Sequence, residues 1–373
     1  MKHDARSHAH HAPLAIGKLP NELLADLIQP LRNPRPELLT GPAVGEDCAI
    51  LDLNGGWLVA TTDPITGSDK EIGRLGIHVS LNDLASAGAE PVAVLVTLLC
   101  PPGTLEETVR AIMDSIRETA GAMHIALAGG HTEVTDAVTR TVLSVTALGR
   151  ANPGAAVTTA GARPGDALVM TKTAALEGTA ILAREREAEL IRAFGPELVA
   201  QAMACLDDIS VVAEGRVAAR HGVHAMHDIT EGGVLGAAWE LCAASGVRAE
   251  IWADRIPVRD ATRSICAHFG IDPFRLISSG SMLMACADGE AMVRRLADAG
   301  IQATVIGTVI KTEDGVPNLA AGSVINTEDG VPSLAIDGAV PPQASVGWHV
   351  LLHRQGSVEA VDAPGADELY KVL

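Results

Sequence analysis

Acidic side chains recur beside glycines and hydroxyl residues along this sequence, and they are the groups best suited to chemistry. They form five short clusters: Gly45-Glu46-Asp47, Thr61-Thr62-Asp63, Asn82-Asp83, Gly129-Gly130-His131-Thr132-Glu133 and His227-Asp228-Ile229-Thr230-Glu231-Gly232-Gly233. Carboxylate oxygens suit Mg²⁺, which keeps several waters and takes one or two carboxylates together with substrate phosphates. Each cluster alone also fits a solvated turn, but their recurrence after apolar stretches favours a Mg²⁺ and phosphate site.

Two glycine pairs offer a second kind of phosphate contact. Gly129-Gly130 follows an expected strand, and Gly232-Gly233 opens an expected helix, so backbone amides at both places can face phosphate oxygens. A tight capped turn is the alternative for each pair. His131 and His227 are candidates for metal ligands or general bases, because imidazole titrates near neutral pH, and hydrogen-bonded structural histidines are the alternative.

Several common catalytic motifs are absent from the sequence. It contains neither G-x-x-x-x-G-K-[ST] nor G-x-G-x-x-G, and no Ser-His-Asp order or H-E-x-x-H motif can be assembled. Lys18, beside Gly17, is a flexible cation that can neutralise phosphate charge, although a surface lysine is the simpler interpretation.

Composition excludes some partners. The formal net charge of -18 repels nucleic acid and anionic membranes, and only 2% of residues are aromatic, so we expect no nucleic-acid partner. The longest apolar run, Val92 to Cys100, is about half of what a membrane span needs. The six cysteines lack C-x-x-C pairing and read as reduced core residues. We expect a cytoplasmic protein that does not contact membranes.

The hydrophobic pattern predicts an α+β (α/β-like) protein of two domains. We expect a disordered His-rich leader at residues 1–14, an N-terminal domain at 15–155, a C-terminal domain at 160–345 and a C-terminal tail at 346–373. The expected helices are 19–31, 72–87, 105–123, 176–190, 197–203, 211–221, 234–245 and 290–299. The expected strands are 48–51, 57–62, 92–99, 125–128, 140–148, 167–171, 281–286 and 304–310.

One internal repeat is plain near the C-terminal end. The stretch that begins at Gly307 is followed at once by a similar one that begins at Gly322, and each contains Thr-Glu-Asp-Gly-Val-Pro. Asp-Gly between apolar runs is a strong hairpin signal, so the repeat predicts two successive β-hairpins.

Taken together, the clusters resemble the aminoimidazole ribonucleotide (AIR) synthase superfamily, in the branch of the hydrogenase expression/formation protein HypE. The supporting strings run in the family's order from about residue 15: Gly17-Lys-Leu-Pro, Gly45-Glu-Asp-Cys-Ala-Ile-Leu, Thr61-Thr-Asp-Pro, Asn82-Asp-Leu-Ala-Ser-Ala-Gly-Ala-Glu-Pro, Gly129-Gly-His-Thr-Glu, Lys172, Glu177-Gly-Thr-Ala and His227-Asp-Ile-Thr-Glu-Gly-Gly.

This resemblance implies a fold, a cofactor and a site. It implies a homodimer in which the N-terminal domains form a β-barrel, a C-terminal α+β domain, and ATP with Mg²⁺ in the cleft between them. The implied metal ligands are Asp47, Asp63, Asp83 and Asp228. The implied cofactor-binding residues are Lys18, Asp47, Asp63, Asn82, Asp83, Gly129, Gly130, Thr132, Lys172, Gly232 and Gly233. We expect the catalytic groups among His131, Glu133, His227 and Glu231.

The sequence departs from named members of the superfamily at three places. HypE-like enzymes end in a reactive cysteine, whereas this sequence ends at Leu373. HypE itself typically has arginines where this sequence has His227 and Glu231. His131 is similar to the selenophosphate synthetase form, but that family's reactive N-terminal cysteine or selenocysteine is missing.

The resulting hypothesis is an ATP- and Mg²⁺-dependent, HypE-like enzyme that activates an amide or carbonyl oxygen by phosphoryl transfer, in hydrogenase or metalloenzyme maturation. Its substrate would be a small molecule or a group on a carrier protein, and a maturation partner is expected. Two alternatives stay open: a small-molecule kinase or AIR-type cyclo-ligase, and a non-catalytic nucleotide-binding maturation partner.

Overall fold

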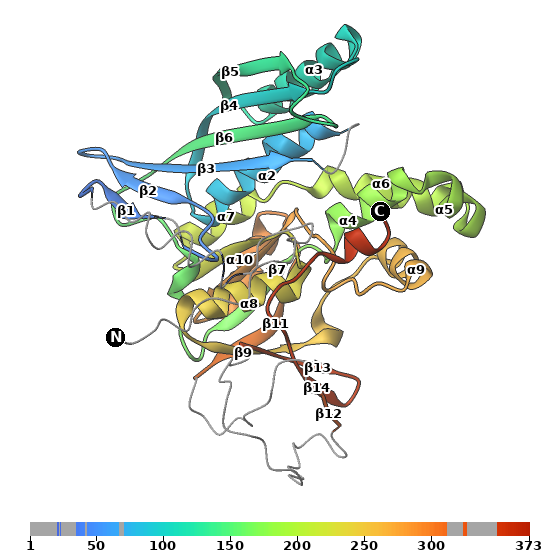
Figure 1. Cartoon of the computed structure of the whole chain (residues 1–373). Helices are drawn as coiled ribbons and strands as arrows, with labels where there is room; N and C mark the ends of the chain where they lie inside the picture. Colours follow the sequence, from blue (N-terminus) through green and yellow to red (C-terminus); the bar gives the residue numbers. More distant parts are fainter. Residues whose placement is uncertain are drawn as a thin grey trace, which may run out of the picture.

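The chain folds around two β-sheets, one above the other in the view of Figure 1. The structure is a computed structural model that describes residues 21, 23, 35–41, 43–66, 71–311, 324–326 (backbone only) and 349–373. Within these ranges, the upper sheet has six strands in the order β1-β2-β3-β6-β4-β5. They are β1 (Leu38–Thr40), β2 (Ala49–Asp52), β3 (Trp57–Ile65), β4 (Glu90–Cys100), β5 (Ala126–Val134) and β6 (Val142–Ala151).

Two helices, α2 (Ile72–Ser86) and α3 (Glu106–Ala122), cover one face of this sheet. The side chains of β6 alternate as expected for a half-covered strand, since Leu143, Val145 and Ala147 are fully buried. The residues between them are only half-buried, because none of the described helices packs on that side. Helix α2 therefore has its apolar residues against the sheet and its other side toward the rest of the chain.

The lower sheet has eight strands among the described residues, in the order β12-β14-β13-β9-β11-β7-β10-β8. They are β7 (Ala167–Thr171), β8 (Ala225–Ile229), β9 (Arg248–Trp252), β10 (Ser281–Cys286), β11 (Ala303–Ile310), β12 (Val324–Asn326), β13 (Val350–Arg354) and β14 (Ser357–Ala360). Helix α8 packs on one face of this sheet and helices α7 and α10 pack on the other.

The helices of the C-terminal half are α4 (Leu176–Glu185), α5 (Glu187–Phe194), α6 (Pro196–Met203), α7 (Val212–Arg220), α8 (Gly233–Ser245), α9 (Asp260–Phe269) and α10 (Gly289–Asp298). Short 3₁₀ turns are η2 (Thr159–Gly161), η3 (Ala204–Asp208), η4 (Ala253–Arg255) and η5 (Glu368–Lys371). The single helix expected over 176–190 is two helices, interrupted at Arg186, whose guanidinium donates to Glu189 and to the Val372 carbonyl. The sequence has no helix breaker there, so this interruption depends on tertiary contacts.

The segment 346–373, expected as a tail, contributes two strands to the lower sheet. Strand β13 pairs in parallel with β9, and β14 returns antiparallel beside β13. Its apolar side chains fill the sheet, since Val350 and Leu352 are fully buried. The expectation of a tail was wrong because a five-residue strand gives too short a pattern to stand out.

The pair Gly129-Gly130 lies inside strand β5 and not in a loop. The pairing of β4 with β5 shifts register between Val94 and Leu95, and both glycines adopt positive φ, at +156° and +150°. A Cβ on Gly130 would lie 1.9 Å from the Val96 carbonyl oxygen, so the two strands approach too closely for any other residue. Strand packing therefore explains Gly130, whereas a Cβ on Gly129 would meet open space.

Several expectations fall on residues outside the described ranges. They are the leader at 1–14, Lys18, most of the helix expected over 19–31, and most of the repeated hairpins. Of the repeat, the described part is the end of β11 and the backbone of β12, which pairs with β14.

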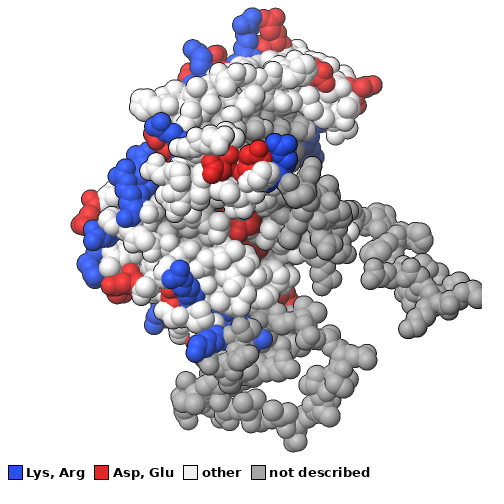
Figure 2. Space-filling model, turned by 90° about the vertical axis from the view of Figure 1, so that its left-hand side faces the viewer, with Lys and Arg blue, Asp and Glu red and all other residues white. Residues whose placement is uncertain are grey.

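The state of the cysteines, the length of the helices and the charges on the surface can be compared with what the composition predicted. All six cysteines are free and buried, as predicted. Within the described residues, each helix is too short or too polar to span a bilayer. On the face in Figure 2, Lys and Arg side chains follow one edge with Asp and Glu between them.

A close helix crossing holds α2 against α7. A Cβ added to Gly215 of α7 would lie 2.2 Å from the Ala85 carbonyl oxygen of α2. We expect Gly215→Ala to lower the free energy of unfolding by about 2 kcal/mol, since overpacking forces backbone shifts. Urea unfolding measures this. Gly121→Ala in α3 is the control, because its Cβ would meet open space, and it should be neutral or stabilising by up to about 1 kcal/mol. Equal effects of the two substitutions would contradict the packing argument.

Candidate functional site

Helix α2 carries three polar side chains that are buried in the middle of the molecule. Asn82 is fully buried, Asp83 is 6% exposed and Ser86 is 2% exposed. Buried polar groups need partners, because leaving one unpaired costs about 1–3 kcal/mol. Each of the three finds its partner in a different part of the chain.

Asn82 connects α2 to the segment before α7. Its amide nitrogen donates to the Ile209 carbonyl and its oxygen accepts from the Val211 amide, both at 2.9 Å. In this structure Asn82 therefore links the two halves of the chain, and its cofactor-binding role stays a prediction.

Asp83 is surrounded by other acidic groups. Thr61 donates a hydrogen bond of 2.6 Å to its carboxylate, and Asp63 is hydrogen-bonded to it as well. Burial, followed by the charges of Asp228, Asp63 and Asp47, raises the pKa of Asp83 well above its ordinary value. The other three predicted metal ligands thus place like charges around the buried Asp83 carboxylate, an arrangement that a cation relieves.

His227 joins this group from strand β8. Its Nδ1 lies 2.9 Å from Asp47 Oδ2 and 4.0 Å from Asp228 Oδ1, and its Nε2 lies 3.0 Å from Glu240 Oε2. Burial opposes a charged imidazole, but the contacts with Asp47 and Glu240 outweigh it and raise the pKa of His227 well above its usual range. Ser86 completes the arrangement by donating to Asp47 at 2.8 Å.

Glu240 and Ser86 were missed by sequence reasoning. Glu240 stands alone as a charged residue in the otherwise apolar helix α8, and it is only 6% exposed. A lone carboxylate on a buried helix implies a hydrogen-bonded partner, so that pattern is a usable signal. Ser86 resembles any small helical residue and offers no such signal.

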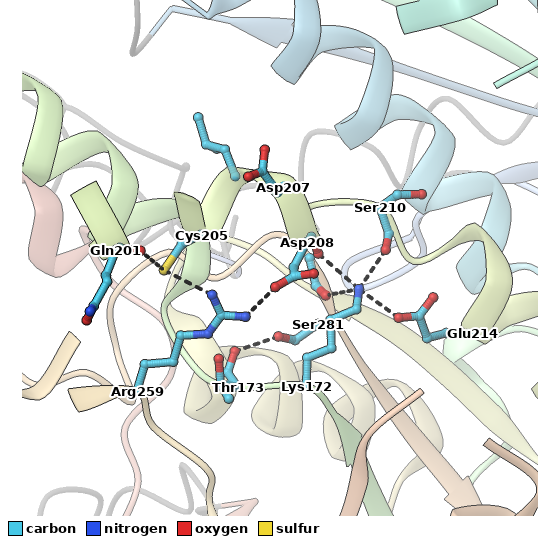
Figure 3. Close-up of polar contacts among 12 residues, drawn as sticks. Lys172, Thr173, Gln201, Cys205, Asp207, Asp208, Ser210, Glu214, Arg259 and Ser281 are labelled. Atoms are coloured by element: carbon cyan, nitrogen blue, oxygen red, sulfur yellow. Dashed lines mark hydrogen bonds and ion pairs between the residues drawn. The ribbon is translucent and has the colours of Figure 1, made fainter. Parts of the chain in front are cut away.

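Lys172 lies in a separate network, drawn in Figure 3. Its Nζ donates to the carbonyls of Asp208, Ser210 and Gly280 at 3.0, 2.6 and 2.7 Å, and it forms an ion pair of 2.7 Å with buried Glu214. An ammonium has three donors, and these contacts use them. In this structure Lys172 therefore fixes the segment before α7 and has no donor left for a phosphate.

His131, Thr132 and Glu133 lie away from the acidic cluster. They are on the edge strand β5, where His131 Nε2 and Glu133 Oε2 are 3.1 Å apart and both side chains are exposed. Three strand spacings separate β5 from β3, or roughly 14 Å. Within one protomer these residues do not join Asp47, Asp83 and Asp228.

Glu231, Gly232 and Gly233 lie at the start of α8, where they meet the C-terminal segment. The Gly232 amide donates to Asp367 at 2.8 Å, and the Tyr370 hydroxyl donates to Glu231 at 2.9 Å. Glu177 of α4 is nearby, and burial, with smaller effects from Asp367 and Glu231, raises its pKa to about 7. The expected anion position at Gly232 is thus filled by a carboxylate of the same chain.

The comparisons with known proteins identify the class. Residues 45–151 match the family model of the N-terminal domain of AIR synthase related proteins, and residues 163–319 match that of the C-terminal domain. The chain belongs to this family, as the motifs predicted.

Relatives of this chain within the family include hydrogenase maturation proteins. A Methanocaldococcus jannaschii protein named for hydrogenase expression and formation is 30% identical over 81% of this chain and 91% of its own length. The carbamoyl dehydratase HypE of Cupriavidus necator is 28% identical over 70% of this chain and 75% of its own. The predicted HypE-like branch is confirmed.

Solved structures agree on the fold. The crystal structure of E. coli HypE superposes with a TM-score of 0.67 at 23% identity, over 94% of this chain and 99% of that one. A HypE structure in complex with ATP superposes with a TM-score of 0.62 at 22% identity, over 80% of this chain and 89% of that one. The predicted two-domain AIR synthase fold is confirmed.

The buried Glu177 leads to a pH-dependent prediction. Its pKa in the folded chain, about 7, lies above its ordinary value of 4.5, so burial stabilises the protonated form and stability falls as the pH rises toward 7. Glu177→Gln mimics the protonated form. We expect its free energy of unfolding to equal that of the original chain near pH 4.5 and to exceed it by up to about 3 kcal/mol above pH 7.

Urea unfolding of both proteins between pH 4.5 and pH 8 measures the difference. Glu197→Gln, at an exposed position of α6, is the control and should follow the original chain at every pH. Parallel curves for the original chain and Glu177→Gln would show that the Glu177 carboxyl titrates normally.

Proposed function

We propose that this protein is an ATP- and Mg²⁺-dependent enzyme that phosphorylates an amide or carbonyl oxygen during hydrogenase or metalloenzyme maturation. The observation that carries the proposal is the convergence of Asp47, Asp63, Asp83 and Asp228, of which Asp83 and Asp228 are buried and the other two are partly buried. The substrate is a small molecule or a group on a carrier protein, such as a carbamoyl group on a thiol.

The donor set fits Mg²⁺. Asp47, Asp63, Asp83 and Asp228 offer carboxylate oxygens, and Mg²⁺ binds through one or two carboxylates while substrate phosphates and waters complete its octahedron. When bound, Mg²⁺ neutralises phosphate charge and aligns the transferred group. The Thr61 hydroxyl donates to Asp83 and the Ser86 hydroxyl donates to Asp47, so both carboxylates are held in position before the ion binds.

Phosphoryl transfer from ATP to the substrate oxygen depends on how the protein positions the two reactants, and it needs no covalent nucleophile from the protein. The substrate oxygen attacks the terminal phosphorus, the bond from that phosphorus to the bridging oxygen breaks, and ADP leaves. The carbon–oxygen bond then breaks and the oxygen departs as phosphate, which is a far better leaving group than hydroxide. An amide loses its two N–H protons as a carbon–nitrogen triple bond forms, whereas at a carbonyl group an incoming nucleophile takes the place of the phosphate. The absence of a Ser-His-Asp order in the sequence is consistent with this route.

The ATP-binding half of the proposal is tested by Asp83→Asn. Loss of one carboxylate charge removes attraction for Mg²⁺, so we expect the affinity for ATP in the presence of Mg²⁺ to fall at least tenfold, with the fold retained. Titration calorimetry measures the affinity and thermal unfolding checks the fold. Asp114→Asn, on the exposed surface of α3, is the control and should bind as the original chain does. Unchanged affinity in Asp83→Asn would remove this residue from the site.

Phosphate release tests the catalytic half. With ATP, Mg²⁺ and a thiol carrying a carbamoyl group, we expect inorganic phosphate to appear in proportion to substrate consumed. Tight ATP binding without release, with every candidate acceptor, would favour the non-catalytic nucleotide-binding partner. Formation of ADP and a phosphorylated acceptor from free small alcohols or phosphate esters, without release of inorganic phosphate, would favour the small-molecule kinase.

The homodimer is a second part of the proposal. The face of the upper sheet opposite α2 and α3 presents half-buried and exposed apolar side chains, and Val92 and Leu95 of β4 are 47% and 38% exposed. The edge strand β5 adds exposed Leu127 and Val134. Contiguous apolar surface of this kind marks an interface, and an uncovered strand edge is closed by pairing. Two such sheets facing each other would form the β-barrel that the family resemblance implies.

Leu95→Asp tests the interface. A charge on this face should be strongly unfavourable in a dry contact, so we expect a monomer in sedimentation equilibrium at micromolar concentration. Leu105→Asp is the control, since Leu105 is exposed at the start of α3 on the opposite side and should leave the dimer intact. A dimer that survives Leu95→Asp would contradict the use of this face.

A further inference from the structure

One nitrogen atom lies among the oxygen ligands of the proposed site. Among the residues that the structure describes, Asp47, His227 and Asp228 each place one ligand atom within 4.8 Å of the other two. The nitrogen is Nδ1 of His227, at 2.9 Å from Asp47 Oδ2 and 4.0 Å from Asp228 Oδ1. His227 and Asp228 are almost fully buried, at 3% and 1% exposed.

The other ring nitrogen of His227, Nε2, already forms a hydrogen bond with Glu240. Nε2 of His227 lies 3.0 Å from Glu240 Oε2, and an ionised carboxylate can only accept, so Nε2 carries a proton toward Glu240. Histidines that bind metals almost always donate their second ring N–H to a carboxylate, a carbonyl or water, which fixes the tautomer. Glu240 comes from a different element, helix α8, and is outside the ligand set. It therefore supplies an observation independent of the three ligand atoms.

We propose that Asp47, His227 and Asp228 bind a divalent transition metal ion, with Nδ1 of His227 as a nitrogen ligand and Glu240 as its positioning residue. The proton that Nδ1 shares with Asp47 leaves when the metal binds. This inference specifies the metal of the proposed nucleotide site and so rests on the proposed function.

The separations suit such an ion. Ligand atoms lie about 2.0–2.2 Å from a bound transition metal, so two of them are at most about 4.4 Å apart. The separations of 2.9 and 4.0 Å fall within this limit as they stand. The third separation, at most 4.8 Å, needs only a small rotation of an aspartate side chain.

A nitrogen ligand changes which ion is preferred. Mg²⁺ favours oxygen ligands and dehydrates reluctantly, whereas imidazole suits Fe²⁺, Ni²⁺ and Zn²⁺, and the affinity of a site with nitrogen and oxygen ligands rises along the first transition row from Mn²⁺ through Co²⁺. A site that offers two carboxylates and one imidazole should therefore bind Mn²⁺ or Co²⁺ more tightly than Mg²⁺. Nucleotide phosphates would then complete the coordination in the active complex.

Pulsed electron paramagnetic resonance with Mn²⁺ tests the nitrogen ligand directly, in the full chain and without nucleotide. The four histidines of the leader, His3, His8, His10 and His11, are replaced by glutamine in every sample because they would add their own signals. We expect a hyperfine coupling from one ¹⁴N nucleus, and labelling with ¹⁵N-histidine should convert it to a ¹⁵N coupling. Calorimetry should give a Mn²⁺ affinity at least tenfold above that for Mg²⁺.

Substitutions identify which histidine supplies the nitrogen that is coupled to Mn²⁺. His227→Gln should lose the coupling and at least tenfold in Mn²⁺ affinity, whereas Glu240→Gln should keep the coupling and lose about tenfold in affinity. The matched control is His224→Gln, because His224 is a nearby half-buried histidine that pairs with Asp166 at 2.9 Å, and it should keep both. The ¹⁵N-histidine measurement needs no variant, so it decides the question even where His227→Gln does not fold.

The outcomes separate this inference from the proposed function. Absence of a histidine nitrogen coupling, or an unchanged coupling in His227→Gln, would overturn the nitrogen ligand while Mg²⁺-ATP binding stands. A histidine coupling in a chain that binds no ATP with either metal would support the metal site and overturn the nucleotide function.

Discussion

The rest of the structure depends on one constraint: helix α2 buries polar side chains, and each of them needs a hydrogen-bond partner. Asn82, Asp83 and Ser86 are buried polar residues of α2, and a buried polar group without a partner is costly. Their partners come from the segment before α7, from β3 and from the loop before β2. The hydrogen bonds that give the buried polar side chains of α2 their partners therefore also fix both halves of the chain around this helix. They hold the carboxylates of Asp47 and Asp83 in fixed positions.

The acidic cluster of Asp47, Asp63, Asp83 and Asp228 lowers the stability of the folded chain when no cation is bound. Several carboxylates close together in a buried volume destabilise one another, and the raised pKa of Asp83 expresses this repulsion, which adds to the effect of burial. His227 offsets part of the charge by standing between Asp47 and Glu240. A divalent ion would relieve the remainder, so the binding of metal and nucleotide is coupled to the stability of the contact between the two halves.

The sequence predicted the features that depend on local pattern. Strands β7 and β10 are largely apolar runs and occur where expected. Asp47, His227 and Asp228, which the sequence singled out as candidates, place ligand atoms within 4.8 Å of one another. Features that depend on packing between distant residues were not predictable. The interruption at Arg186 and the close approach of Gly130 to Val96 have no local signal. Lys172 matched a family motif, but its partners are carbonyls more than thirty residues away, which no pattern around it reveals.

The order of strands around β9 also bears on the repeated stretch of sequence. Strand β11 ends beside Arg248 and β13 begins beside Ala249, on either side of β9, so these two points of the chain lie roughly 10 Å apart. Between them in the sequence, β12 pairs with β14 at the far side of the same sheet. The entropy of closing a chain between two such fixed points grows only logarithmically, by about 0.6 kcal/mol for each doubling in length. Whatever its own conformation, the intervening stretch can thus lengthen by duplication at little thermodynamic cost. The ends of β11 and β13 are thus a place where the chain can gain residues without any change in the sequence of α2 or β8.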